Sequence, residues 1–348
     1  MSAREKEREG AGGSAGADGS AGADGSEGAG GSEEEVPRGS SLWRDAFRRL
    51  KKNRAAVVSA AILGVVVLAC LLQPSLSSHP YDRTDLSVGP TPPSWEHWMG
   101  TDYFGRDLMT RVLFGGRISF GVALTATSLS LLIGVTWGGI AGYAGGKVDA
   151  IMMRIVDVLY TFPFLVFVIL LMVFFAGPDS PLYSGFLAAL SPFVSDAKDK
   201  GFFPIFQLFV VFAAIGSISW LTMARIVRGQ VLSLRNQPFV EAARSIGVGP
   251  AGLVFRHLLP NALGPIIVYT TLTIPEVMMT EAFLSFLGLG TQEPLSSWGL
   301  LASTGAEVMD SYPWQLVFPS VFLALTLFCF NFLGDGLRDA LDPRLRKD

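Results

Sequence analysis

The hydrophobic pattern of this chain consists of long apolar stretches separated by segments rich in Gly, Pro and charged residues. A helix needs about 20 mostly apolar residues to cross the hydrocarbon core of a bilayer. An open strand cannot cross it, because each unpaired backbone group in lipid costs several kcal/mol. The pattern therefore predicts an all-α integral membrane protein with six transmembrane helices, at Ala55–Leu72, Ile118–Ala141, Ile155–Ala176, Pro204–Ala224, Ala262–Leu287 and Leu316–Leu333.

Lysine and arginine gather in three of the polar segments. This bias predicts orientation, because positively charged loops stay in the cytoplasm. With an even number of spans the three basic segments lie on one side of the membrane, so we expect both termini in the cytoplasm. The cytoplasmic C-terminal segment is expected at residues 341–348. Residues 73–116 and 177–203 then lie outside, the second as a loop with a short amphipathic helix. The basic segments contain Arg44, Arg48, Arg49, Lys51, Lys52 and Arg54; Arg225, Arg228, Arg235, Arg244 and Arg256; and Arg338, Arg344, Arg346 and Lys347.

Residues 1–40 differ from the rest, because they are mostly Gly, Ala, Ser, Asp and Glu, with a tandem Ser-Ala-Gly-Ala-Asp-Gly hexapeptide. So few apolar side chains cannot offset the entropy of ordering the segment. It is neither a signal peptide, which needs an apolar core near its start, nor an amphipathic transit peptide. We expect a disordered tail, with a docking tail as the alternative, followed by a basic cytoplasmic segment at residues 41–54.

Composition supports a membrane protein and argues against a soluble enzyme. Charged residues make up 16% of the 348 residues, whereas soluble domains carry about a quarter. A formal net charge of −3 gives no general attraction to nucleic acid. Cys70 and Cys329 lie inside apolar stretches and belong to no Cys/His cluster. This usage excludes a disulfide scaffold and a zinc site.

Two glycine-rich stretches have only the outline of nucleotide-binding motifs. Gly247–Gly252 matches G-x-G-x-x-G, but it contains Pro250 and lies between two apolar spans, where no strand precedes it. Gly142–Lys147 lacks the leading glycine of a phosphate loop and the Ser or Thr that follows its lysine. We therefore expect this chain to hold no nucleotide of its own.

Small and ionisable residues inside the spans are the next candidates for function. Gly134, Gly138 and Gly142 recur every four residues, a spacing that allows helices to approach closely, either within the bundle or against a second subunit. Asp157 follows Arg154 by about one helical turn, so an ion pair accounts for it. Charged groups in a span usually face a cavity or a partner. Glu276 and Glu281 therefore line a pathway or handle protons, or else they are buried hydrogen-bonding groups that fix helix packing.

The polar segment between the fourth and fifth spans predicts two short helices. The first runs from about Phe239 to Ile246 and ends at Gly247, which can adopt a positive φ, and the second ends at Pro260. Glu241 suits the N-terminal dipole of the first helix. The small side chains of Ala242 and Ala243 would leave a flat surface to which another protein could bind. The alternative is an amphipathic connector lying on the membrane.

This segment resembles the EAA loop of ABC importer permeases, through Glu241-Ala-Ala243, Gly247 and Leu259-Pro260. The resemblance extends from about Trp43 to Arg346 and is to the C-type permease of the oligopeptide, dipeptide and nickel branch. The further matching motifs are Thr101-Asp102, Gly105-Arg106-Asp107, Arg117-Ile-Ser119, Ala141-Gly142-Tyr143, Phe283–Gly290, Ser297-Trp298-Gly299 and Leu333–Arg344.

The resemblance implies a type I ABC importer permease fold, with a core at residues 117–340 and a cytoplasmic coupling loop at residues 238–260. The chain would form half of a heterodimeric channel in the bacterial inner membrane and import di- or oligopeptides or related small solutes by ATP-driven alternating access. Its partners would be a sister permease, two ATPases and an external solute-binding protein. The ATPases would bind ATP and Mg²⁺ and hydrolyse ATP, so this chain would be neither an enzyme nor a cofactor carrier. The resemblance assigns the coupling role to Glu241, Ala242, Ala243, Gly247, Leu259 and Pro260.

Two other functions compete with this interpretation. A proton-coupled secondary transporter would use Glu276 and Glu281, although the two halves of the chain show no internal repeat of the kind common in such proteins. A structural membrane protein would explain the spans but not the glycine-bounded loop. The chain departs from the family pattern in its Gly/Ala/Asp tail, at Glu276 and in the length of residues 177–203. His257 stands where the general EAA pattern has an apolar residue, which the peptide branch accepts. None of these features identifies the transported molecule.

Overall fold

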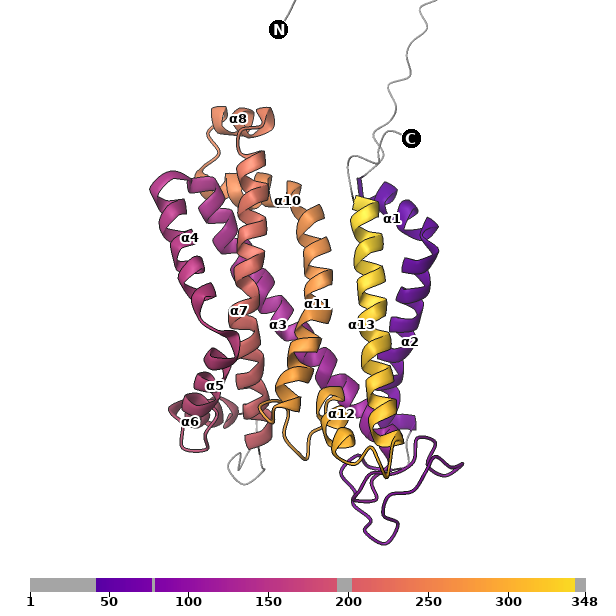
Figure 1. The fold of residues 1–348 in the computed structure, drawn as a ribbon. Coiled ribbons are helices and arrows are strands. Elements are labelled where there is room, and N and C mark those ends of the chain that lie inside the picture. Colours follow the sequence, from indigo (N-terminus) through magenta and orange to yellow (C-terminus); the bar gives the residue numbers. More distant parts are fainter. Residues whose placement is uncertain (1–41, 77–78, 193–201, 342–348) are drawn as a thin grey trace, which may run out of the picture. The chain divides into compact units, whose positions relative to one another are not determined.

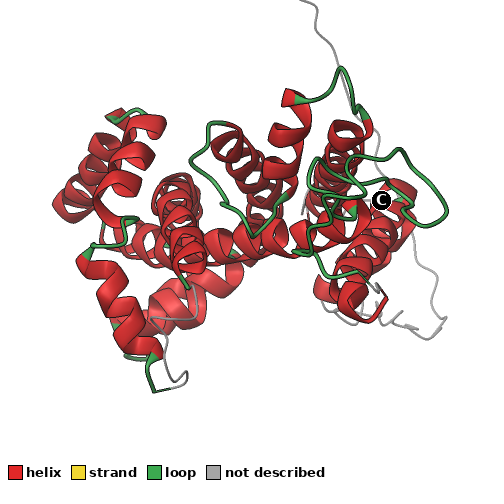
Figure 2. Ribbon diagram, turned by 90° about the horizontal axis from the view of Figure 1, so that it is seen from below, coloured by secondary structure: helices red, strands yellow, loops and turns green. Residues whose placement is uncertain are grey.

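The computed structural model describes residues 42–76, 79–192 and 202–341, and their regular elements are all helices (Figures 1 and 2). The expected tail at residues 1–40, the segment at 342–348 and Asp196, Lys198, Asp199 and Lys200 lie outside the described residues. The helices are α1 (Leu42–Lys52), α2 (Arg54–Leu76), α3 (Leu108–Ala144), α4 (Gly146–Thr161), α5 (Phe164–Phe175), α6 (Pro181–Leu190), α7 (Phe203–Leu234), α8 (Pro238–Ser245), α9 (Pro250–Gly252), the π-helix η1 (Leu253–Leu258), α10 (Leu259–Asn261), α11 (Leu263–Phe286), α12 (Trp298–Glu307) and α13 (Trp314–Leu341).

Five helices of the described part of the chain are long and apolar enough to cross a membrane: α2, α3, α7, α11 and α13. The pair α4 and α5 makes a sixth span if it is counted as one, and it is bent by 85°. The expected single helix at Ile155–Ala176 is therefore two helices with a bend between them. Pro163 lacks a backbone N–H and disfavours helical backbone in the residue before it. Phe162 accordingly is extended, with φ −74° and ψ 130°.

Two other expected boundaries also move. The Asp107 side chain accepts a hydrogen bond from the Thr110 backbone N–H at 2.8 Å and caps α3, so the helix begins at Leu108 and the preceding loop ends well before residue 116. At the other end of the bundle, α7 continues ten residues past the expected Ala224 to Leu234. The short helix in the 177–203 loop, α6, is apolar rather than amphipathic along most of its length.

Glycines on one face of α3 bring this helix against α7. A Cβ added at Gly134 would lie 2.6 Å from Met223 Cβ, and one added at Gly142 would lie 2.9 Å from Val231 Cβ. Only a residue without a side chain fits at these positions. The glycine spacing therefore serves packing within the bundle, the first of the two expected roles.

The ends of this bundle carry different elements. Figure 1 shows α1, α8 and the C-terminal end of α13 at one end, and α6, α12 and the loop before α3 at the other. α7 contacts both α4 and α11, so these three helices lie side by side (Figure 1). The loop that contains α8 and the long loop before α3 are thus at opposite ends.

Candidate functional site

The loop between α7 and α11 begins with α8, which ends at Ser245, and Gly247 follows two residues later. This glycine has φ +88°, and its N–H donates to the Arg244 carbonyl at 3.0 Å. The next N–H, of Val248, donates to the Ala243 carbonyl at 3.2 Å. The two bonds satisfy carbonyls that the end of a helix leaves free, and they need the left-handed conformation that glycine adopts without strain. Gly247 therefore fixes the direction in which the chain leaves α8.

The two faces of α8 have opposite environments. Val240 and Ala243 are buried, and they pack with Leu253, Val254 and Leu258 of η1 in one cluster. The same cluster includes Met223, Val227 and Val231 of α7 and Ile266 of α11. One side of α8 therefore belongs to the same packed core as α7 and α11.

The outward face of the loop carries Glu241, Ala242 and Ile246, the last with 82% of its surface exposed. Ala243 is only 5% exposed. Of the two alanines expected on the outer surface, Ala242 therefore lies there and Ala243 does not. Residues three apart share one face of a helix, and Ala243 therefore follows Val240 inward. Of the other predicted coupling residues, Gly247 and Pro260 are exposed and Leu259 is buried.

The two glutamates of α11 lie in different surroundings and do not form one site. Glu276 is exposed, whereas the Glu281 side chain is 1% exposed. Glu281 Oε1 accepts hydrogen bonds from Ser285 Oγ and Ser297 Oγ, each at 2.7 Å, and from Thr291 Oγ1 at 3.4 Å. Ser297 also caps α12 by accepting from the Leu300 N–H at 3.2 Å. These contacts favour the expected packing role for Glu281.

Ion pairs join α4 to α7. Asp157 Oδ1 accepts from Arg225 Nη2 at 2.8 Å, so the expected partner, Arg154, is wrong. One turn further along α7, Arg228 donates two hydrogen bonds to Asp149, at 2.5 and 2.6 Å. Helix α4 thus pairs with charges on a neighbouring helix instead of with its own, which sequence spacing along α4 cannot reveal.

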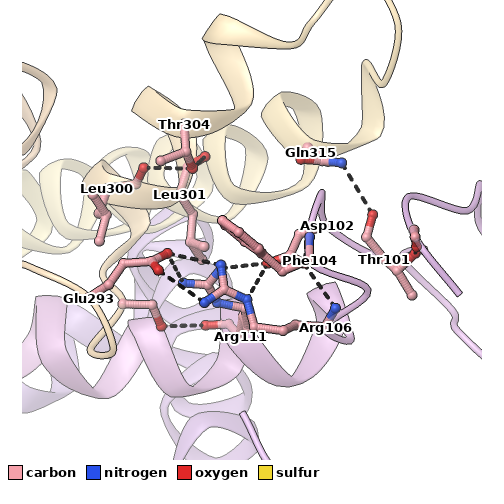
Figure 3. A network of polar contacts seen from close by, with 12 residues as sticks. Thr101, Asp102, Phe104, Arg106, Arg111, Glu293, Leu300, Leu301, Thr304 and Gln315 are labelled. Carbon is pink, nitrogen blue, oxygen red and sulfur yellow. Dashed lines mark hydrogen bonds and ion pairs between the residues drawn. The ribbon is translucent and has the colours of Figure 1, made fainter. Parts of the chain in front are cut away.

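A charge network at the opposite end of the bundle, buried except at Glu293, was not predicted from the sequence (Figure 3). Asp102 Oδ2 accepts from Arg106 Nε at 2.7 Å and from Arg111 Nη1 at 2.6 Å. Glu293 Oε1, in the α11–α12 loop, accepts from Arg106 Nη2 at 2.9 Å and from Arg111 Nη2 at 3.1 Å. Asp102 and Arg106 belong to a noted motif, but Glu293 lies 187 residues further along the chain, so no spacing signalled the contact.

The two arginines hold Glu293 in its charged form. Burial opposes ionisation, but the hydrogen bond from Arg106 and the charge of Arg111 outweigh it and lower the pKa of the Glu293 carboxyl below its usual value. The same region reaches α13, because the Thr101 carbonyl accepts from Trp314 Nε1 at 3.1 Å and Gln315 Nε2 at 3.3 Å. The network therefore ties the start of α3 to the α11–α12 loop, while Thr101 ties it to α13.

Comparison with known proteins identifies two family models along the chain. Residues 134–347 match "Binding-protein-dependent transport system inner membrane component", and residues 41–93 match "N-terminal TM domain of oligopeptide transport permease C". The oligopeptide transport system permease protein OppC of Escherichia coli K12 is 48% identical over 310 residues, which are 88% of this chain and 93% of that protein.

Two relatives from Bacillus subtilis extend the comparison. Its oligopeptide permease OppC is 45% identical over 307 residues, covering 88% of this chain and 91% of the relative. Its dipeptide transport system permease protein DppC is 43% identical over 308 residues, covering 88% and 87%. The similarity thus spans nearly all of the described helices and includes the α8 loop.

Proposed function

Because the chain belongs to the family of binding-protein-dependent transport system inner membrane components, we propose that it forms one half of the peptide pathway in a bacterial ABC importer. It is a multi-pass protein of the bacterial inner membrane. Its partners in this proposal are a sister permease, two ATPases and an external solute-binding protein. The relatives are named as oligopeptide and dipeptide permeases, so di- and oligopeptides are the proposed cargo. The relatives give no support to the proton-coupled alternative.

In this proposal both termini and α8 face the cytoplasm, where the ATPases bind ATP and Mg²⁺ and carry out hydrolysis. Helix α8, at that end of the bundle, carries Glu241, Ala242 and Ile246 outward and Val240 and Ala243 inward. This division between a free face and an anchored face is the observation that carries the proposal. An ATPase that grips the outward face moves α7 and α11 with it, because the inward face packs against them.

Nucleotide can shift the equilibrium between inward-open and outward-open states only through contacts that differ between them. The α8 loop is the proposed place for those contacts. The other coupling residues have supporting roles: Gly247 sets the angle of α8, Leu259 anchors the second half of the loop in the core, and Pro260 ends it on the surface. The chain itself carries out no covalent step.

Reversal of the charge at Glu241 tests this proposal. We expect Glu241→Lys to reduce ATP-driven peptide uptake by about tenfold, because reversing a charge at a protein interface removes its electrostatic complementarity with the partner. Uptake of a labelled tripeptide and ATP hydrolysis are measured together in proteoliposomes that contain the complete importer. Gly247→Ala, which strains a backbone with φ +88°, is a second variant expected to lower the uptake per ATP hydrolysed.

Each variant has a matched control. Glu307 is an exposed glutamate on α12, at the other end of the bundle, and Glu307→Lys should leave coupling unchanged (Figure 1). Gly249 has φ −69° and open space around its Cα, so Gly249→Ala should behave as the unmodified protein does. Normal uptake in both Glu241→Lys and Gly247→Ala would remove the coupling role from this loop.

A further inference from the structure

Three adjacent helices, each part of a candidate membrane span, carry a group of polar side chains that are exposed or half-buried. The helices are α4, α7 and α11, with α7 in the middle (Figure 1). We name these groups the polar strip, which consists of Asp157 and Tyr160 on α4, Thr222 and Arg225 on α7, and Tyr269 and Glu276 on α11.

Side-chain contacts make the strip continuous from one helix to the next. Arg225 pairs with Asp157 at 2.8 Å and stacks over the Tyr160 ring, 4.1 Å from its centroid. The Tyr160 hydroxyl forms a hydrogen bond with Thr222 Oγ1. On the other side, Tyr269 lies close enough to interact with Thr222 and Glu276. These contacts therefore link α4 to α7, and the Tyr269 hydroxyl extends them to α11.

The exposure of these groups is incompatible with contact to lipid. The Asp157 and Arg225 side chains are 55% and 46% exposed, and Glu276 is exposed as well. Charged side chains within a transmembrane segment are costly in contact with lipid, and such groups face a cavity or a partner. By contrast, the exposed surface of α2 is apolar at Val58, Val65, Leu68 and Leu71. We therefore expect the exposed surface of α2 to contact lipid and the polar strip to contact water.

The chemistry of the strip matches the groups that every peptide carries. Among the described residues Arg225 already has a carboxylate partner, whereas Glu276 forms no ion pair. A free carboxylate in a water-filled space attracts an ammonium group such as a peptide N-terminus. The hydroxyls of Tyr160, Thr222 and Tyr269 offer hydrogen bonds that do not depend on the side chains of the cargo.

We propose that the polar strip lines the aqueous peptide pathway and that Glu276 receives the N-terminal ammonium group of the passing peptide. This inference rests on the proposed function and names the part of the chain that meets the cargo. It separates the two glutamates of α11, since Glu281 is held inside the bundle by three hydroxyl groups and Glu276 faces the pathway.

Thiol labelling tests the proposal, because both native cysteines, Cys70 and Cys329, are buried and give little background. Thr222→Cys is compared with Val65→Cys, on the apolar surface of α2, where the side chain is 68% exposed. A membrane-impermeant methanethiosulfonate reagent reacts with the thiolate, which forms in water and not in lipid. In the complete importer in open membrane fragments, we expect Thr222→Cys to react at least about tenfold faster than Val65→Cys, and its labelling to stop peptide uptake.

The charge of the reagent tests the role of Glu276. Thr280 lies one turn further along α11 and donates to the Glu276 carbonyl at 2.8 Å. We expect Thr280→Cys to react about threefold faster with a cationic reagent than with an anionic one, and Glu276→Gln in the same variant to abolish this preference. Glu307→Gln, on α12, should leave the preference unchanged.

Two results would overturn the proposal: reaction of Thr222→Cys no faster than that of Val65→Cys, or a cation preference that survives Glu276→Gln. ATP-driven tripeptide uptake by the unlabelled variants separates this failure from failure of the proposed function. If the Thr222→Cys importer takes up peptide but its thiol does not react, the polar strip does not line the pathway and the proposed function still stands. Absence of ATP-driven uptake in the unmodified importer removes the proposed function itself.

Discussion

Replacing Gly138 by leucine is expected to separate α3 from α7 and to destabilise the bundle by about 3 kcal/mol. A Cβ at this position would overlap the Ala224 carbonyl oxygen and would lie 2.9 Å from Val227 Cβ. A carbonyl inside a helix cannot turn away, so the backbones themselves must move apart. Such a movement would also loosen Gly134 and Gly142, which use the same face of α3.

The measurement is the thermal stability of the detergent-solubilised chain, together with its yield from membranes. Gly121→Leu is the control, because Gly121 belongs to the same helix and an added Cβ there meets no atom within 4 Å. Leucine favours a helix more than glycine does by about 1 kcal/mol, so this variant should be as stable as the unmodified chain. An equal loss of thermal stability in Gly138→Leu and Gly121→Leu would contradict this prediction. It would show that chain entropy or membrane insertion, and not α3–α7 packing, causes the loss.

Replacing Trp298 by alanine is expected to cost about 3–5 kcal/mol and to release α12 from α3. The Trp298 side chain is fully buried, and its Nε1–H donates to the Val112 carbonyl at 2.8 Å. Its backbone N–H donates to Ser119 Oγ at 3.1 Å, and its ring meets Phe120 edge to face at 5.4 Å. Truncation would leave a cavity and remove the indole hydrogen bond that joins α12 to α3.

Limited proteolysis of the α11–α12 loop, at residues 288–297, reports the release of α12, and thermal unfolding reports the loss of stability. Trp95→Ala supplies the comparison, because this tryptophan is 97% exposed and its removal opens no cavity. Unchanged protease resistance in Trp298→Ala would mean that α12 is held mainly by other contacts, such as those of Ser297 with Glu281.

Much of the fold could be predicted because the bilayer imposes a simple rule on sequence. Long apolar stretches become helices, and all six expected spans overlap helices of the structure. Local chemistry decided the exceptions. Pro163 breaks the third span, and the Asp107 cap starts α3 ten residues, or about three turns, before the expected Ile118. Both signals were present in the sequence but act over only a few residues.

For the candidate site, too, features set by neighbouring residues could be predicted from the sequence, and contacts between distant residues could not. The α8 loop was found because its residues are contiguous and Gly247 marks the turn. The partner of Asp157, on α7, and the link from Glu293 to Arg106 and Arg111 were not found, since they depend on how helices pack. The inward side of Ala243 follows from helical periodicity, and the neighbouring Val240 was the signal that could have revealed it.

The central claim is that this chain conducts peptides under the control of partner ATPases. The most direct test reconstitutes the chain with the proteins that copurify with it in mild detergent and measures the uptake of a labelled tripeptide into proteoliposomes. The account predicts a second permease and ATPases in the complex, and uptake that requires ATP and the solute-binding protein and ignores a pH gradient. Recovery of the chain alone, with uptake driven by a pH gradient without ATP, would contradict it.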